Sequence, residues 1–207
     1  MFHGNAGSAA GRDYLIDPIQ EGVGADVFVL EYPGYADRPG KPTEASLVAA
    51  GLEALSRIPD GAPVVLVGES LGSGVASAVA GAAPDRVRAV LLLVPFRELA
   101  EAAASHYPWL PVRLLLRDRF ASHEHLARHP GPVGFVVAGR DRVVPPESGR
   151  ALHGGFPGRK RLWEFPGEGH WEGSNRDPAF YSGFDTWRRS FTADSAPSPG
   201  RRPGSAD

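Results

Sequence analysis

The chain of 207 residues contains no cysteine. Disulfide bonds, thiolate nucleophiles and zinc–thiolate centres are therefore excluded as sources of structure or chemistry. The sequence also lacks an excess of charge of one sign, because 22 Lys and Arg residues are set against 24 Asp and Glu residues. A net charge of −2 provides no broad basic field, so we expect no nucleic-acid partner.

Long apolar runs are absent as well. No run approaches the roughly 20 residues that a membrane-spanning helix requires, so we expect no membrane span in this chain. The start, Met1 to Gly4, does not combine a basic region with an apolar stretch as a signal peptide does. The sequence as given predicts a cytoplasmic protein, with membrane association only where an upstream segment supplies an anchor. Its length and 42% hydrophobic content are typical of one globular domain.

The sequence does contain an abrupt change from strand to helix. The β-branched run Val64–Val67 stops at Gly68-Glu69-Ser70-Leu71-Gly72, and small residues typical of a helix continue through Ala83. The glycines on both sides of Ser70 permit a strained backbone and close packing of neighbouring segments. Such a turn lifts the serine hydroxyl clear of the sheet, as in a nucleophile elbow. The alternative is a glycine-rich turn in some other parallel-sheet protein.

The remainder of the chain alternates strands with helices, which is typical of a parallel sheet covered by helices on both faces. Further strands are predicted over 26–32, 87–94, 133–138 and 161–165, and helices over 9–21, 43–58, 146–155 and 177–191. Residues 96–130 break this rhythm, and we interpret them as a cap inserted over the serine. The Ser-, Pro- and Gly-rich residues 192–207 are predicted to be a disordered tail.

Three side chains of complementary chemistry follow predicted strands. Ser70, Asp141 and His170 each come just after a strand. Because ligands bind at the carboxyl ends of the strands in such sheets, we expect the three side chains to meet there. His170 can accept the serine proton, and Asp141 can orient the imidazole. The order Ser, Asp, His along the chain is that of the α/β-hydrolases.

An acyl-transfer site also needs N–H donors for the oxyanion of its tetrahedral intermediate. We expect the backbone N–H groups of Leu71, directly after the serine, and of Asn5, in the small-residue loop 3–8, to fill this role. The cap aromatics Phe96, Tyr107 and Trp109 either line an acyl pocket or merely pack the cap.

Three histidines in the cap, His123, His125 and His129, raise the question of a metal. No carboxylate or cysteine completes a ligand set with them in sequence, so we expect a solvated cap helix and no metal. Glu69, beside the serine, is predicted to be a local hydrogen-bond acceptor.

Six segments of the chain resemble those of the α/β-hydrolase superfamily, and more narrowly the BEM46/ABHD-type serine hydrolases, close to those called serine aminopeptidase-like. The segments are Phe2-His3-Gly4-Asn5-Ala6-Gly7, Tyr32-Pro33-Gly34-Tyr35, Gly40-Lys41-Pro42, Gly68-Glu69-Ser70-Leu71-Gly72, Asp141-Arg142-Val143-Val144-Pro145 and Gly167-Glu168-Gly169-His170. The resemblance implies an α/β-hydrolase domain over residues 1–191. It also implies hydrolysis of carboxylic esters, thioesters or related acyl bonds of a small-molecule substrate, through an acyl-enzyme intermediate and without a cofactor.

The chain departs from the family pattern at its start. Family members enter the His-Gly-Asn-Ala-Gly loop from a strand that lies between those at 26–32 and 63–68, and two more strands precede it. Without that strand, each buried backbone group left unpaired costs about 1–3 kcal/mol. We therefore expect either that the two flanking strands pair directly and displace Asn5, or that the given start lies inside a longer gene. The alternative function is an inactive or truncated α/β-hydrolase-fold protein without catalysis.

Overall fold

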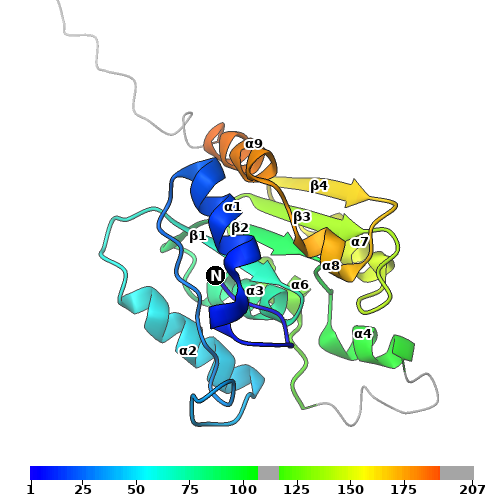
Figure 1. The fold of residues 1–207 in the computed structure, drawn as a ribbon, viewed down its shortest axis with the longest axis horizontal. Helices are drawn as coiled ribbons and strands as arrows, with labels where there is room; N and C mark the ends of the chain where they lie inside the picture. Colours follow the sequence, from blue (N-terminus) through cyan, green and yellow to red (C-terminus); the bar gives the residue numbers. More distant parts are fainter. Residues whose placement is uncertain (107–116, 192–207) are drawn as a thin grey trace, which may run out of the picture.

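The computed structural model describes residues 1–106 and 117–191, and a sheet of four strands lies at its centre (Figure 1). The strands are β1 (Val64–Glu69), β2 (Val87–Leu93), β3 (Val133–Ala138) and β4 (Lys160–Phe165). They lie side by side in chain order, and each neighbouring pair is parallel. The parallel sheet predicted from the alternation of strands and helices is therefore confirmed.

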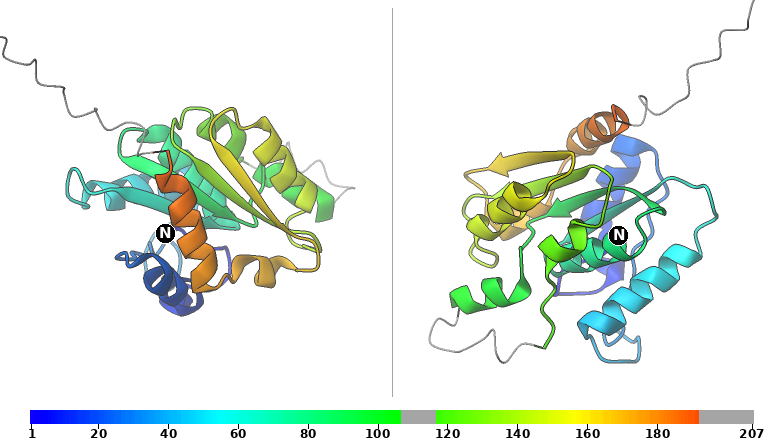
Figure 2. Two further views of the ribbon diagram at one scale, coloured as in Figure 1. Left: turned by 90° about the horizontal axis from the view of Figure 1, so that it is seen from above. Right: turned by 180° about the vertical axis from the view of Figure 1, so that it is seen from behind.

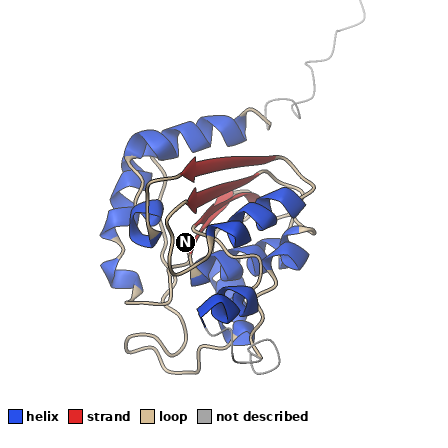
Figure 3. Ribbon diagram, turned by 90° about the vertical axis from the view of Figure 1, so that its right-hand side faces the viewer, coloured by secondary structure: helices blue, strands red, loops and turns tan. Residues whose placement is uncertain are grey.

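Helices cover both faces of this sheet (Figure 3). One face carries α1 (Asp13–Val23) and α9 (Pro178–Arg189), which pack against each other (Figure 2). The other face carries α2 (Glu44–Ser56), α3 (Leu71–Ala82), α6 (Ser122–Leu126) and α7 (Pro146–Gly155). Shorter elements are the 3₁₀ turn η1 (Ala9–Gly11), α4 (Leu99–His106) and α8 (His170–Ser174).

Two apolar cores result, and β2 separates them. Leu91 and Leu93 point into the core beneath α1 and α9, whereas Val90 and Leu92 point into the core beneath α2, α3 and α7. A strand buried on both faces needs apolar residues at consecutive positions, which explains why β2 is a continuous apolar run. The described helices include none that is both long and apolar enough to cross a bilayer.

The strand predicted over 26–32 is wrong. Only a single bridge forms there, between Leu30 and Phe2, and Phe2 bridges to Gly68 of β1 on its other side. A strand requires a partner along its length, and only Met1 and Phe2 lie beside this segment. The apolar run in the sequence was therefore not sufficient to make a strand.

Direct pairing between this segment and β1 was one of the two alternatives considered from the sequence, and it does not occur. Phe2 lies between them, donating its N–H to the Val67 carbonyl at 2.8 Å and accepting the Glu69 N–H at 3.0 Å. The Leu30 N–H donates to the Met1 carbonyl at 3.1 Å. The loop that follows Phe2 thus enters the structure next to β1, where Ser70 lies.

The helix predicted over 9–21 is divided in two by Arg12. The 3₁₀ turn η1 ends at Gly11, and α1 begins only at Asp13. The Arg12 side chain is buried and donates to the Ala6 carbonyl, so the chain must turn at this point. The helix start predicted near Thr43 is confirmed, because the Thr43 hydroxyl accepts the Ser46 N–H at the first turn of α2.

His129 makes stability sensitive to acid. It is buried, and neither ring nitrogen has a hydrogen-bond partner among the described residues. Burial lowers the pKa of His129 from its ordinary value of 6.5 to about 4. The unfolded chain therefore binds this proton at a higher pH than the folded chain, and stability falls as the pH drops from 6.5 toward 4.

We expect the urea midpoint of the natural protein to fall between neutral pH and about pH 5, and His129→Leu to reduce that fall. The comparison is made within each protein, so a change in overall stability caused by leucine does not affect it. Equal falls in both proteins would contradict the assignment of acid sensitivity to His129.

Candidate active site

Ser70 lies at a sharp turn between β1 and α3. Its backbone has φ 50° and ψ −117°, a conformation that residues with a side chain rarely adopt. Two close approaches require the flanking glycines. A Cβ on Gly68 would lie 2.4 Å from the Gly72 carbonyl oxygen, and a Cβ on Gly72 would lie 2.1 Å from the Phe2 carbonyl oxygen. The strand, turn and helix predicted around Ser70 are all present.

The structure brings Ser70, Asp141 and His170 together. The Nε2 atom of His170 is 3.1 Å from the Ser70 hydroxyl, and its Nδ1 atom is 2.7 Å from Oδ2 of Asp141. The His170 side chain is 9% exposed and that of Asp141 is 2% exposed. A histidine held in this way can accept a proton from the serine while the carboxylate fixes its orientation.

Backbone N–H groups hold the Asp141 carboxylate in place. Its Oδ1 atom accepts the N–H of Val143 at 2.8 Å and the N–H of Val144 at 2.9 Å. The other oxygen is thereby directed at His170. The aspartate thus belongs to a tight turn just after β3, which is the structural role that a Gly-Arg-Asp sequence suggests by itself.

His170 begins a short helix, α8, which is absent from the helices predicted from the sequence. Gly169 precedes this helix, and its N–H donates to the Glu172 side chain at 3.1 Å. A glutamate three residues after the N-cap is a helix-start signal, so the sequence did contain the information. The consequence is that the His170 backbone is fixed by helical hydrogen bonds at the edge of the site.

Glu69 connects this site to the first residues of the chain. Its buried carboxylate accepts the Gly4 N–H at 3.0 Å and the Tyr14 hydroxyl at 2.7 Å, and lies 3.5 Å from the Arg12 guanidinium. Burial, followed by the hydrogen bond to Glu69, raises the pKa of Tyr14. The prediction that Glu69 is a hydrogen-bond acceptor is confirmed, but its partners come from distant parts of the sequence.

The loop over residues 3–8 lies close to Ser70. A Cβ on Gly4 would lie 3.5 Å from the Ser70 Cβ. The Tyr32 hydroxyl donates to the His3 carbonyl at 2.9 Å, and the Tyr35 hydroxyl donates to the Asn5 side chain at 2.6 Å. His3 is fully buried against these tyrosine rings.

Two backbone donors beside Ser70 are free. Within the described ranges, neither the Asn5 N–H nor the Leu71 N–H has a hydrogen-bond acceptor. Leu71 is the first residue of α3, where a backbone N–H has no partner inside the helix.

A family model described as "alpha/beta hydrolase fold" matches residues 1–130. The chain belongs to the α/β-hydrolase fold family. The resemblance stated from the motifs is thereby confirmed, and relatives agree with it. This α/β hydrolase is 37% identical over 200 residues to Rv2307c, an uncharacterized protein of Mycobacterium tuberculosis, covering 93% of the chain and 68% of that protein.

Two further relatives belong to the narrower group named by the motifs. Protein bem46 of Schizosaccharomyces pombe is 25% identical over 174 residues, which cover 80% of this α/β hydrolase and 58% of the yeast protein. Lysophosphatidylserine lipase ABHD12 of Danio rerio is 31% identical over 176 residues, which cover 73% of the chain but only 45% of the fish protein.

Solved structures show the same fold. Alpha/beta hydrolase domain-containing protein 10 from mouse superimposes with a TM-score of 0.69 and 17% identity, over 92% of this chain and 89% of that one. Monoacylglycerol lipase of Paleococcus ferrophilus superimposes with a TM-score of 0.62 and 20% identity, over 91% of this chain and 93% of that one.

The predicted acyl-pocket residues have different positions in this α/β hydrolase. Phe96 is 1% exposed and lies in the core, where its ring would be 2.8 Å from a Cβ on Gly74. Tyr107 and Trp109 lie outside the described residues, as does the predicted tail at 192–207. The pocket role of all three aromatics, and the cap and tail assignments, stay predictions.

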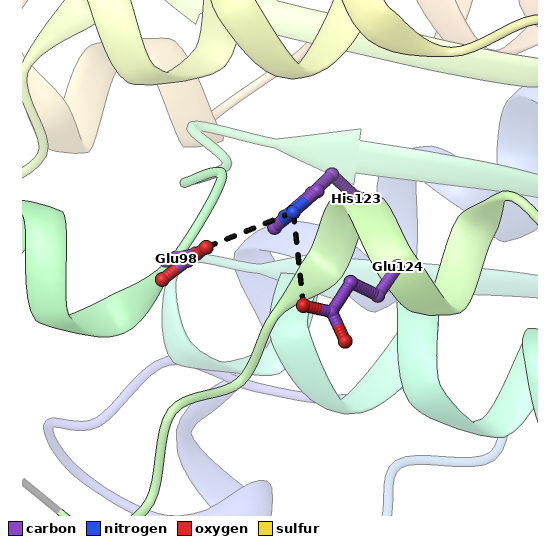
Figure 4. Close-up of side chains that lie close together, drawn as sticks. All are labelled: Glu98, His123 and Glu124. Atoms are coloured by element: carbon purple, nitrogen blue, oxygen red, sulfur yellow. Dashed lines mark ion pairs between the residues drawn. The ribbon is translucent and has the colours of Figure 1, made fainter.

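A second cluster of titratable side chains in this α/β hydrolase surrounds His123 (Figure 4). Its Nε2 atom is 3.7 Å from Glu98 and 3.9 Å from Glu124. The prediction that no carboxylate joins these histidines is wrong for His123, because Glu124 follows it directly in the sequence and the fold adds Glu98 from the start of the predicted cap. Arg119 lies 3.4 Å from Glu98 and 3.8 Å from Glu124, so a cation of the chain itself already pairs with both carboxylates.

Proposed function

We propose that this protein is a serine hydrolase that cleaves carboxylic esters, thioesters or related acyl bonds. The observation that carries the proposal is the position of His170, 3.1 Å from the Ser70 hydroxyl and 2.7 Å from the Asp141 carboxylate. A serine hydroxyl is a weak nucleophile without a base, and these contacts supply both the base and the group that orients it. Ser70, His170 and Asp141 are the proposed catalytic residues.

In the first half of the reaction, Ser70 Oγ attacks the carbonyl carbon of the substrate and its proton passes to His170 Nε2. The tetrahedral intermediate collapses, the bond to the leaving group breaks, and His170 returns the proton to the departing oxygen or sulfur. Water then attacks the acyl-enzyme, again with His170 as base, and the carboxylic acid leaves as Ser70 recovers its proton. Asp141 stabilises the imidazolium in each half.

The oxyanion of each intermediate needs donors that are already in place. The free N–H groups of Asn5 and Leu71 support their assignment to this role. Glu69 then acts as a positioning residue, because its carboxylate holds the Gly4 N–H and so fixes the loop that carries Asn5. An oxyanion donor is worth about 10²–10³ in kcat in enzymes of this type.

The acyl substrate is proposed to be small and to carry an apolar chain. The support comes from relatives, because ABHD12 is named a lysophosphatidylserine lipase and a structural neighbour is a monoacylglycerol lipase. Both names describe hydrolysis of a single acyl chain from a lipid.

A fluorophosphonate probe tests the proposal directly. Ser70 Oγ would form a bond to phosphorus as fluoride leaves, and only a serine activated by a base reacts at a useful rate. We expect the natural protein to be labelled, whereas Ser70→Ala and the heat-unfolded protein are not. Absence of labelling in the folded natural protein would contradict the proposal and favour the alternative of a fold without catalysis.

A further inference from the structure

Two apolar side chains that the proposed reaction does not use flank the catalytic residues. The large apolar side chains that are exposed in the described part of the chain are Phe28 (68% exposed), Trp171 (59%) and Val143 (49%). Trp171 directly follows His170, and the Val143 N–H donates to Asp141. Isolated exposed apolar residues are ordinary, but two of these three lie beside the same site.

The two loops that carry them are in direct contact. The Arg140 N–H donates to the Glu168 carbonyl at 2.8 Å, and the Asp141 carboxylate meets His170 at 2.7 Å. The two loops begin at the carboxyl ends of the neighbouring strands β3 and β4. Figure 1 shows that the first leads to α7 and the second to α8. Trp171 and Val143 therefore belong to one rim around the site.

The same rim carries two arginines without ion-pair partners among the described residues. Arg140 and Arg142 are exposed, and neither has an ion pair with any described residue. Glu168 pairs with Arg176, whereas Glu147 and Glu164 share Arg150 at 3.1 and 2.6 Å. Glu172 accepts the Gly169 N–H at 3.1 Å.

An exposed tryptophan, an exposed aliphatic side chain and unpaired arginines together fit the surface of an anionic bilayer. Tryptophan is favoured at the boundary between headgroups and acyl chains, and each arginine near an anionic surface gains electrostatic attraction. A protein partner fits less well, because a stable interface buries about 800 Å² on each side and four side chains cover much less.

We propose that the lipid-docking rim, formed by Arg140, Arg142, Val143 and Trp171, binds an anionic lipid surface and brings the proposed catalytic residues close to it. Trp171 and Val143 enter the boundary region, and the two arginines contact lipid phosphates. The role of docking in catalysis rests on the proposed function, because docking would then allow the site to take its acyl substrate from the bilayer. The binding itself does not require an active serine.

The test is cosedimentation of the full chain with vesicles of phosphatidylcholine alone or with about 30% phosphatidylglycerol, at salt concentrations of about 0.1 M and 1 M. We expect binding to the anionic vesicles only, and loss of that binding at high salt. Trp171→Ala and the double variant R140Q/R142Q should each weaken it by at least about fivefold.

Two control variants match these changes away from the rim. Phe28→Ala removes a comparably exposed aromatic ring from the segment that is separated from β1 by Phe2, whereas β4 and Trp171 lie at the opposite edge of the sheet. Arg128→Gln removes an exposed arginine that likewise has no ion pair among the described residues. Both control variants should bind vesicles like the natural protein.

Hydrolysis of p-nitrophenyl acetate in solution is measured in parallel, and the control variant Phe28→Ala should leave it unchanged. Hydrolysis without vesicle binding would overturn the docking inference and leave the proposed function standing. Vesicle binding that Trp171→Ala weakens, in a protein that fluorophosphonate does not label, would support docking and contradict the proposed function. Equal loss in Phe28→Ala, or a dimer that Trp171→Ala separates, would overturn the assignment of this rim to lipid.

Discussion

Replacing Ser70 by alanine is expected to lower kcat for p-nitrophenyl acetate by about 10⁶-fold. The substitution removes the nucleophile itself, so the base and the carboxylate that orients it have nothing left to activate. For the same reason, adding His170→Ala to Ser70→Ala should cause almost no further loss, because residues that act as a unit do not contribute additively. The measurement is release of p-nitrophenolate by each purified variant at equal concentration.

Ser73→Ala provides the matched control. Ser73 lies three residues along the same chain, is fully buried, and its hydroxyl has no hydrogen-bond partner within the described part of the structure. Its removal should leave kcat within about twofold of the natural value, because no step of the proposed reaction uses it. If Ser70→Ala kept the natural rate, the esterase activity would have to come from another residue and the proposed mechanism would be wrong.

Gly72→Ala is expected to destabilise the fold by about 3 kcal/mol or more. The added Cβ would lie 2.1 Å from the carbonyl oxygen and 2.5 Å from the carbonyl carbon of Phe2. These are backbone atoms, and Phe2 is hydrogen-bonded to Val67 and Glu69 of β1, so no rotamer change relieves the clash. Residues 1–4 must move, and the Gly4 contact with Glu69 is lost with them.

The measurement is the free energy of unfolding in urea. Gly183→Ala is the control, and it should change the free energy of unfolding in the opposite direction. Gly183 is an exposed position inside α9, and a Cβ there would meet no atom within 4 Å. Alanine should stabilise α9 by up to about 1 kcal/mol. A Gly72→Ala protein as stable as the natural one would show that the first residues of the chain do not pack on the turn as described.

The sequence was sufficient to predict the four strands of the sheet. Three of them, β1, β2 and β3, are short apolar runs that a parallel sheet buries on both faces, whereas β4 at the edge is partly exposed. The sequence also predicted that Ser70, Asp141 and His170 would meet, because their positions after strands are local facts and parallel topology brings those ends together. The strand predicted at 26–32 does not form. A strand needs a partner along its length, and an apolar run does not specify which segment will pair with it.

The same limit applies to contacts between residues far apart in the chain. Nothing near Glu69 in the sequence identifies Arg12 and Tyr14 as its partners, and nothing near His123 identifies Glu98. These pairs form only when helices from separate parts of the chain pack on one sheet. Helix α8 does not depend on such distant contacts, because Glu172, three residues after Gly169, marks its start locally.

The backbone at Ser70 has an evolutionary consequence. A serine with φ 50° is held against its own conformational preference, at a cost on the order of 1–3 kcal/mol, and glycine would occupy that position with less strain. Selection for stability alone would therefore replace the serine. A lineage that ceased to need the proposed activity would gain robustness by losing the hydroxyl, and the change would then be hard to reverse. A serine at this strained position is therefore accounted for by the proposed chemistry and not by the stability of the fold.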